Sequence, residues 1–129
     1  MPFNELAVLA AALAGFVLGG LWYGPLFRQA RSREAGGDAG SAPQHPVRGF
    51  AIGLLASVIA AATFAWFIGP APGLRIAVQD GALTGLAMVA MSFGITDAFA
   101  RRSLKLWLID AGYHTLQFTL YGLVIGLWQ

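Results

Sequence analysis

The chain has 129 residues, of which 57% are hydrophobic and only 11% charged, and its mean hydropathy is +0.67. Soluble domains carry roughly 25% charged residues to cover a surface that faces water. This composition therefore excludes an ordinary soluble domain and indicates a protein whose apolar surface faces a lipid bilayer. The net charge of +2 gives no support to nucleic-acid binding, and the absence of cysteine excludes disulfides and thiolate metal sites.

Four apolar runs each approach the ~20 residues that an α-helix needs to cross a bilayer. Pro25 ends the first run, and a polar stretch rich in Gly, Ser and Pro at residues 26–46 predicts a flexible loop. The remaining connections are short, so consecutive helices are expected to be antiparallel neighbours. The sequence thus predicts an all-α integral membrane protein, a single domain over residues 1–129, with four transmembrane helices in a compact bundle at about residues 3–24, 47–69, 76–100 and 104–128.

The basic residues predict how the protein is oriented. Glu5, rather than Lys or Arg, precedes the first apolar run, and "WYGP" follows it, so we expect a retained span and not a cleaved signal peptide. Arg75 stands alone between the second and third spans. The other basic residues lie in or beside two connections, the one between the first and second spans and the one between the third and fourth spans. By the positive-inside rule, both of these basic loops are expected in the cytoplasm and both termini outside. The other seven of the eight basic residues are Arg28, Arg31, Arg33, Arg48, Arg101, Arg102 and Lys105.

Glycine pairs at i and i+4 recur in every predicted span. Helices gain no hydrophobic incentive to associate in lipid, and small residues let their backbones approach closely. We therefore expect either a tight bundle or a homo-oligomer. The pairs are Gly15 and Gly19, Gly20 and Gly24, Gly49 and Gly53, Gly81 and Gly85, and Gly122 and Gly126.

Aromatic and polar residues near the span ends have ordinary interpretations. Tryptophan and tyrosine are typical interfacial anchors at such positions, and acidic or amide side chains suit helix N-termini. The expected anchors are Trp22, Tyr23, Trp66, Trp107 and Trp128, and the expected capping residues are Asn4, Glu5, Gln79 and Asp80.

The last span, "LIDAGYHTLQFTLYGLVIGLW", carries Asp110, His114 and Gln117 on one helix face. An aspartate at the centre of a span costs about 2.5–3.5 kcal/mol, so Asp110 should face other helices and find a partner. His114, one turn away, is the expected partner, and the two groups could share a proton. Asp97 is spaced for an ion pair with Arg101, the favoured interpretation, although it could also join Asp110 in a carboxylate cluster.

Three interpretations of these polar residues remain open. They are hydrogen-bonding contacts between helices, a site that handles a proton or a small solute, or a metal site, for which only Asp97 could supply a further ligand. Signatures of hydrolases, zinc proteases and phosphate-binding loops are absent from the sequence, so we expect no enzyme activity, cofactor or metal. The leading hypothesis is proton or solute handling through Asp110 and His114, and the alternative is a non-catalytic structural or assembly subunit of a membrane complex. The expected partners are the lipid bilayer and either a second copy or another membrane protein.

Two stretches carry a family resemblance. "NELAVLAAALAGFVLGGLWYGPLF" at residues 4–27, followed by "LIDAGYH" at residues 108–114, resembles the bacterial membrane family called domain of unknown function 1761. The sequence departs from the lysine and tryptophan that members commonly carry after "GPLF", because residues 28–30 are Arg, Gln and Ala. The most recognisable residues of the family are Trp22, Tyr23, Gly24, Pro25, Asp110 and His114.

The resemblance implies a multi-pass protein of the bacterial inner membrane, with no activity assigned to its family. If the first and last spans are packed as neighbours, the cytoplasmic end of the first span lies beside Asp110. Tyr23 or Trp22 could then donate a hydrogen bond to the Asp110 carboxylate.

Overall fold

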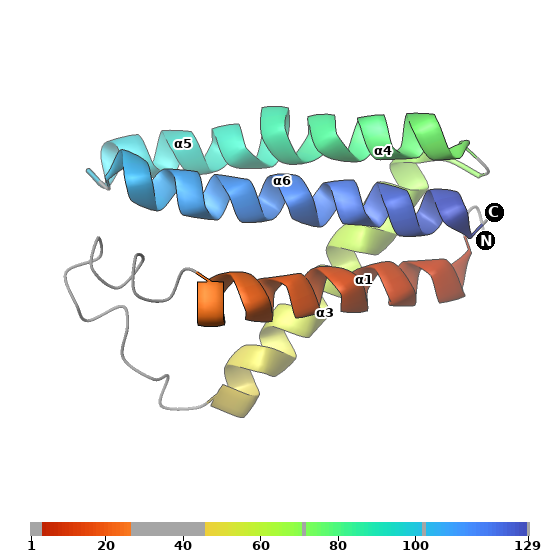
Figure 1. Ribbon diagram of the computed structural model, residues 1–129, viewed down its shortest axis with the longest axis horizontal. Coiled ribbons are helices and arrows are strands. Elements are labelled where there is room, and N and C mark those ends of the chain that lie inside the picture. Colours follow the sequence, from red (N-terminus) through yellow and green to blue (C-terminus); the bar gives the residue numbers. More distant parts are fainter. Residues whose placement is uncertain (1–3, 27–45, 71, 102, 129) are drawn as a thin grey trace.

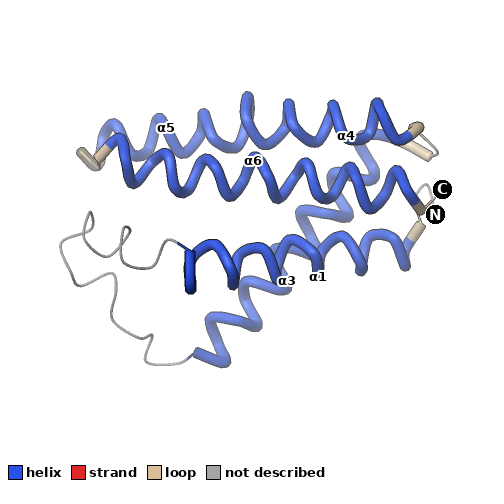
Figure 2. Tube along the Cα trace, in the orientation of Figure 1, coloured by secondary structure: helices blue, strands red, loops and turns tan. Residues whose placement is uncertain are grey.

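A computed structural model describes residues 4–26, 46–70, 72–101 and 103–128, and within these ranges every regular element is helical (Figures 1 and 2). The loop predicted at residues 26–46 lies almost wholly outside the described residues. With it lie the basic residues Arg28, Arg31 and Arg33, and Arg102 is also outside.

Helix α1, Glu5–Leu21, begins at a side-chain cap. The Asn4 carboxamide oxygen accepts hydrogen bonds from the backbone amides of Leu6, at 3.0 Å, and Ala7, at 3.2 Å. These bonds satisfy amides that have no partner in the first turn of a helix. The chain continues into the π-helical segment η1, Trp22–Leu26, and Gly24 breaks the helical backbone there with φ −91° and ψ −108°.

Helix α3, Pro46–Ile68, ends where Gly69 adopts a positive φ of 77°. Glycine tolerates this conformation because it has no Cβ, and proline often follows, as Pro70 does here. Gly73, with φ 85°, precedes the next helix, so a glycine with positive φ lies at each end of the connection.

The third long helix is continuous in space and comprises α4, Leu74–Leu83, the π-helical turn η3, Thr84–Val89, and α5, Ala90–Phe99. It ends where Arg101 adopts a positive φ of 58°. Helix α6, Leu104–Leu127, then begins at Ser103, whose hydroxyl oxygen accepts from the Leu106 amide at 3.1 Å.

Helix α6 is the central element of the arrangement. It lies between α1 on one side and the α4–η3–α5 helix on the other, and its neighbours run antiparallel to it (Figure 1). Helix α3 packs mainly on α1 and crosses it obliquely, with fewer contacts to α4 and α6 (Figure 1). The arrangement is therefore looser around α3 than the predicted compact bundle.

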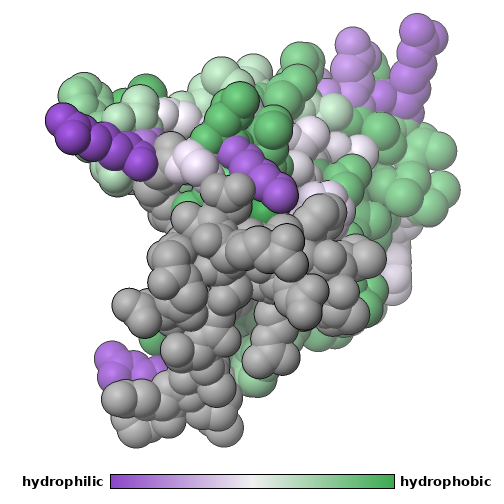
Figure 3. All heavy atoms as spheres, turned by 60° about the vertical axis from the view of Figure 1, so that its left-hand side comes forward, coloured by the Kyte–Doolittle hydropathy of each residue, from purple (hydrophilic) through white to green (hydrophobic). Residues whose placement is uncertain are grey.

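The outer faces of the helices are strongly apolar. On α1, Leu6, Leu9, Leu13 and Val17 are each at least half exposed. The opposite face of α1 is buried and carries small residues, Ala7, Ala11, Ala12 and Gly15 among them. This is the reverse of a soluble amphipathic helix, whose large apolar side chains face the core. Hydrophobic side chains likewise cover much of the described surface in Figure 3.

Three of the described helices are long and apolar enough to cross a membrane: Glu5–Gly24, Arg48–Ile68 and Leu74–Phe99. These correspond to the first three predicted spans. Helix α6 has 24 residues but is not among the three. Polar residues such as Lys105, Asp110, His114 and Gln117 lower its hydropathy, so its place as the fourth span stays a prediction.

Candidate functional site

The end of α1 is joined to the first half of α6 by two hydrogen bonds. The Trp22 indole Nε1 donates to the carbonyl oxygen of Ile109 at 2.8 Å, and the Tyr23 hydroxyl donates to Asp110 Oδ1 at 2.5 Å. Gly112 makes room for this contact, because a methyl group there would lie 3.0 Å from Trp22 Cζ2. The "WYGP" and "DAGYH" stretches, far apart in sequence, thus meet around a carboxylate that is only 4% exposed.

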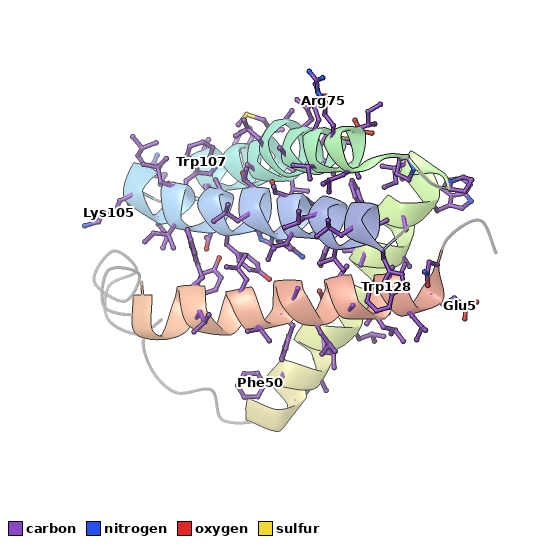
Figure 4. The ribbon with its side chains drawn as sticks, turned by 45° about the vertical axis from the view of Figure 1, so that its right-hand side comes forward. Glu5, Phe50, Arg75, Lys105, Trp107 and Trp128 are labelled. Atoms are coloured by element: carbon purple, nitrogen blue, oxygen red, sulfur yellow. The ribbon has the colours of Figure 1, made fainter. Side chains whose placement is uncertain are left out.

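Two of the expected interfacial anchors are therefore hydrogen-bonded to a neighbouring helix, and a third is bonded in the same way. Trp107 Nε1 donates to the carbonyl oxygen of Ala90 at 2.9 Å, and the indole fills the space beside Gly94. Like Trp22 and Tyr23, Trp107 holds two helices together, and the role of all three as interfacial anchors stays a prediction. Trp66 and Trp128 remain exposed near helix ends, at 60% and 48%. Figure 4 shows Trp107 and Lys105 near one end of α6 and Trp128 at the other.

His114 is not the partner of Asp110, contrary to the sequence-based expectation. Its Nδ1 lies 2.7 Å from Gln117 Oε1, and its ring stacks on Phe93 of α5 with centroids 4.8 Å apart and planes 16° from parallel. No hydrogen bond or ion pair joins His114 to Asp110, both of which are described. Stacking on Phe93 sets the orientation of the His114 imidazole, which therefore points towards Gln117 and not towards Asp110.

From His114 a chain of side-chain hydrogen bonds crosses three helices, which we call the polar chain: His114, Gln117, Tyr121 and Ser57, ending on the Ala12 carbonyl. Gln117 Nε2 donates to the Tyr121 hydroxyl at 2.6 Å. The Tyr121 and Ser57 hydroxyls lie 2.7 Å apart, and Ser57 Oγ donates to the Ala12 carbonyl oxygen at 2.9 Å. The polar chain links α6 to α3 and to α1.

The direction of each bond in the polar chain follows from its two ends. Ser57 has one hydroxyl proton and uses it on the Ala12 carbonyl, so Tyr121 is the donor to Ser57 Oγ. The Tyr121 oxygen accepts from the Gln117 amide, whose own oxygen must accept from His114 Nδ1. This assigns the proton to Nδ1 of His114 from the network.

The polar chain is poorly suited to conducting protons. An amide nitrogen donates hydrogen bonds but has no lone pair with which to accept a proton. A proton that reached Gln117 Oε1 from His114 could not continue through Nε2 to Tyr121 without rearrangement of the amide. The arrangement is chemically fitted to hold helices together. Ser57, Gln117 and Tyr121 are all buried, with Tyr121 completely so.

Tyr113 occupies the space between the Tyr23–Asp110 contact and His114. Its hydroxyl donates to the Gly15 carbonyl oxygen at 3.0 Å, and its ring meets those of Tyr23 and His114 edge-on, with centroids 5.4 and 4.8 Å away. The glycines of α1 make these contacts possible. A methyl group at Gly19 would lie 3.0 Å from the Tyr113 hydroxyl, and one at Gly15 would lie 2.9 Å from Cε1 of Tyr121.

The remaining predicted packing glycines fall into two groups. On α4, η3 and α6, four glycines face the backbone of the opposite helix. A methyl group at Gly85 would lie 2.6 Å from the His114 carbonyl oxygen, and one at Gly126 would lie 3.0 Å from the Leu74 Cα. At Gly81 and Gly122 it would overlap with the carbonyl oxygens of Phe118 and Ala77.

The second group does not pack as the sequence predicted. Gly20, Gly24 and Gly49 have no described atom within 4 Å of the position that a methyl group would occupy. Gly53 makes only an ordinary contact, 3.5 Å from the Phe16 ring. The i, i+4 spacing of glycines therefore predicts more close helix contacts than the described residues make.

Asp97 is buried in α5, at 3% exposure, whereas Arg101 is exposed. No ion pair joins these two described residues, so the favoured pairing is wrong. A pair at i and i+4 needs a helix that continues through both residues, but α5 ends at Phe99 and Arg101 has a left-handed backbone. In the described ranges, no three His, Asp or Glu side chains gather into a group that could hold a metal ion.

The sequence reasoning missed Ser57, Tyr113 and Tyr121. Tyr121 carried a usable signal, because it follows Gln117 by four residues and extends the face that begins at Asp110 and His114. Ser57 carried none, since a single serine in an apolar span is ordinary and its partner lies 64 residues away.

Comparison with known proteins gives a family and no assigned activity. Neither the curated proteins nor the solved structures include a significant match to this chain. A family model described as "Protein of unknown function (DUF1761)" matches residues 6–126, which include both the Trp22–Tyr23 stretch and the Asp110–His114 stretch. The chain therefore belongs to the DUF1761 family of proteins of unknown function.

Proposed function

We propose that this chain is a non-catalytic, four-span protein of the bacterial inner membrane that serves as a structural or assembly subunit. In this proposal the polar residues of α6 hold the helices together and do not process a substrate. Its partners are the lipid bilayer and another membrane protein or a second copy of the chain.

The observation that carries the proposal is the polar chain. Every link of the polar chain, from His114 Nδ1 to Ser57 Oγ, joins a donor to a protein acceptor, and the last acceptor is a backbone carbonyl. Hydrogen bonds of this kind between membrane helices contribute about 0.6–2 kcal/mol each. A set whose members satisfy one another supports a role in assembly, because a transport site needs groups that can exchange partners.

The four-span membrane topology rests on the apolar outer faces and on the position of α6. Three helices have the length and hydropathy of spans, and α6 lies between two of them and antiparallel to both (Figure 1). Because α6 lies between these two helices along its length, it should cross the bilayer wherever they do. Its polar residues Asp110 and Gln117 are buried against other helices, as a bilayer requires.

One observation favours the second candidate function, proton or solute handling. Asp110 is buried, and its Oδ1 lies only 2.5 Å from the Tyr23 hydroxyl. An ionisable group at such a depth is a functional candidate by default. This candidate needs Asp110 to change its protonation state, whereas the assembly role needs only its hydrogen-bond acceptor.

Substitutions of Asp110 separate the two functions. Asp110→Asn keeps an oxygen that can accept from Tyr23 but cannot titrate, and Asp110→Leu removes the acceptor as well. For an assembly role, we expect Asp110→Asn to retain the thermal stability of the wild type. We expect Asp110→Leu to lose about 1–3 kcal/mol, because the hydrogen bond from the Tyr23 hydroxyl to residue 110 is removed.

Proton flux in reconstituted liposomes completes the test. With a pH-sensitive dye inside, wild type and Asp110→Asn should both match empty liposomes under an imposed pH gradient. Flux through the wild type that Asp110→Asn abolishes, with its thermal stability unchanged, would instead establish proton handling and overturn the assembly role.

A further inference from the structure

A groove opens between α3 and the α4–η3 segment, away from the polar chain. It encloses about 700 Å³, with Phe64 and Phe67 on the α3 side, Leu83 and Met88 on the other, and Phe118 of α6 also lining it. Phe67 and Met88 are 74% and 65% exposed, so the groove is open towards the outer apolar surface. Its volume falls in the range of about 300–1,000 Å³ that small-molecule sites occupy.

One carboxylate lies in this apolar groove. The sequence interpretation treated Asp80 as a helix cap, but α4 begins at Leu74, so Asp80 lies about 9 Å farther along the axis. It is therefore inside the Leu74–Phe99 segment that could cross a membrane. Asp80 is half-buried, and its side chain makes no hydrogen bond or ion pair with any described residue.

The other polar groups of the groove are acceptors or hydroxyls. Thr63 and Thr84 line it with Asp80, and the Thr63 hydroxyl already donates to the Ile59 carbonyl oxygen at 2.8 Å, which leaves its oxygen to accept. The lining formed by the described residues contains no Lys, Arg or His. The groove therefore offers a negative charge, hydroxyl oxygens and apolar walls, and no cation of its own.

We propose that this groove binds a lipophilic cation, a small amphiphile with a protonated amine and an apolar body. The ammonium group pairs with Asp80 and donates to the hydroxyl oxygen of Thr63 or Thr84, and the apolar body packs on Phe64, Phe67 and Met88. Charge complementarity selects this occupant. A neutral acyl chain would match the walls equally well but would leave the carboxylate facing hydrocarbon, which is costly.

The proposal goes beyond the assembly role and is independent of it, because none of its residues belongs to the polar chain or contacts Asp110. Dansylcadaverine is a suitable probe, since it joins a fluorescent apolar group to a primary ammonium. Its N-acetylated form has the same apolar group and no charge. Binding of both probes is measured by dansyl fluorescence with the full chain in lipid nanodiscs.

The wild type should bind the amine at least about tenfold more tightly than the acetylated form. Asp80→Asn should reduce this preference to near unity. The matched control Glu5→Gln, which neutralises an exposed acid outside the groove, should keep it. Thermal stability of each variant in the same nanodiscs shows that the chain is folded.

A steric pair tests the position of the site. Ala87 lines the groove and is exposed, so Ala87→Phe should weaken binding of both probes by filling the space. Ala56→Phe, at an exposed position of α3 outside the groove, should have no effect. Equal affinity of the wild type for both probes, or an amine preference that survives Asp80→Asn in a folded protein, overturns the proposal. So does binding that Ala87→Phe leaves unchanged.

Discussion

Tyr121 lies fully buried where α6 meets α1 and α3, and its hydroxyl group both accepts and donates a hydrogen bond. The hydroxyl accepts from the Gln117 amide and donates to Ser57 Oγ. Its ring occupies the space that Gly15 leaves open. At the scale of single residues, this hydroxyl joins α6 to α3, and Ser57 extends the link to the Ala12 carbonyl of α1.

Tyr121→Phe removes that atom and changes little else. The Gln117 Nε2 donor then has no acceptor in a buried place, and the loss expected is about 1–3 kcal/mol in the free energy of unfolding. Unfolding by SDS in mixed micelles measures it. Thr119→Val is the matched control, because the Thr119 hydroxyl bonds only within α6, to the Thr115 carbonyl. Equal midpoints for the two variants would show that the polar chain does not stabilise the fold.

The site could be anticipated from the sequence where helix geometry alone decides the contact. The order and direction of the spans brought Tyr23 beside Asp110, and the structure has this hydrogen bond. The pairing of Asp110 with His114 failed, because Phe93 of a different helix sets the orientation of the imidazole. The spacing of residues along one helix shows which of them are neighbours on that helix. It does not show that an aromatic ring from another helix stacks on one of them.

At the scale of elements, the contact between α4 and α6 is built on backbone approach. Gly81 and Gly122 each face a carbonyl oxygen of the opposite helix, with no room for a methyl group. Such closeness strengthens van der Waals contact between helices, which replaces the hydrophobic driving force that lipid removes.

Gly122→Ala should separate these helices. The added methyl group meets the Ala77 carbonyl, which belongs to the backbone and cannot rotate away, so we expect a loss of about 1–3 kcal/mol or more in stability. Gly20→Ala is the matched control, since no described atom lies within 4 Å of its methyl position. Alanine favours a helix over glycine by up to about 1 kcal/mol, so this variant should be as stable as the wild type or more so.

Melting of both variants in the same detergent, followed by size-exclusion chromatography after heating, compares them directly. A lower melting temperature for Gly20→Ala than for Gly122→Ala would contradict the close contact of α4 with α6.

The positions of the helices were predictable and their crossing was not. The apolar runs at residues 47–69 and 76–100 correspond closely to Pro46–Ile68 and Leu74–Phe99, because run length and proline or glycine breaks fix helix ends. The oblique path of α3 depends on how side chains of the two helices interdigitate. One such contact is the edge-on packing of Phe16 of α1 against Phe50 of α3. Hydrophobic periodicity in one chain does not report such a fit.

At the scale of the whole molecule, charge is distributed between two ends. Both termini and the connection between α3 and α4 lie at one end, and the connection between α5 and α6 lies at the other (Figure 1). Among the four described basic residues, Arg75 belongs to the first end and Lys105 to the second (Figure 4). Arg101, in the connection between α5 and α6, and Arg48, at the start of α3, also lie away from the first end. The positive-inside rule then predicts that the Arg101 end is cytoplasmic.

Single cysteines test this orientation cleanly, because the native chain has none. Pro70→Cys places a thiol in the exposed connection after α3, and Ala100→Cys places one at the exposed end of α5. In intact spheroplasts, a membrane-impermeant maleimide should label Pro70→Cys and leave Ala100→Cys unlabelled until the membrane is permeabilised. The reverse pattern would put the arginines outside. Labelling of both sites in intact spheroplasts would mean that Leu74–Phe99 does not cross the bilayer, and the four-span topology would fail with it.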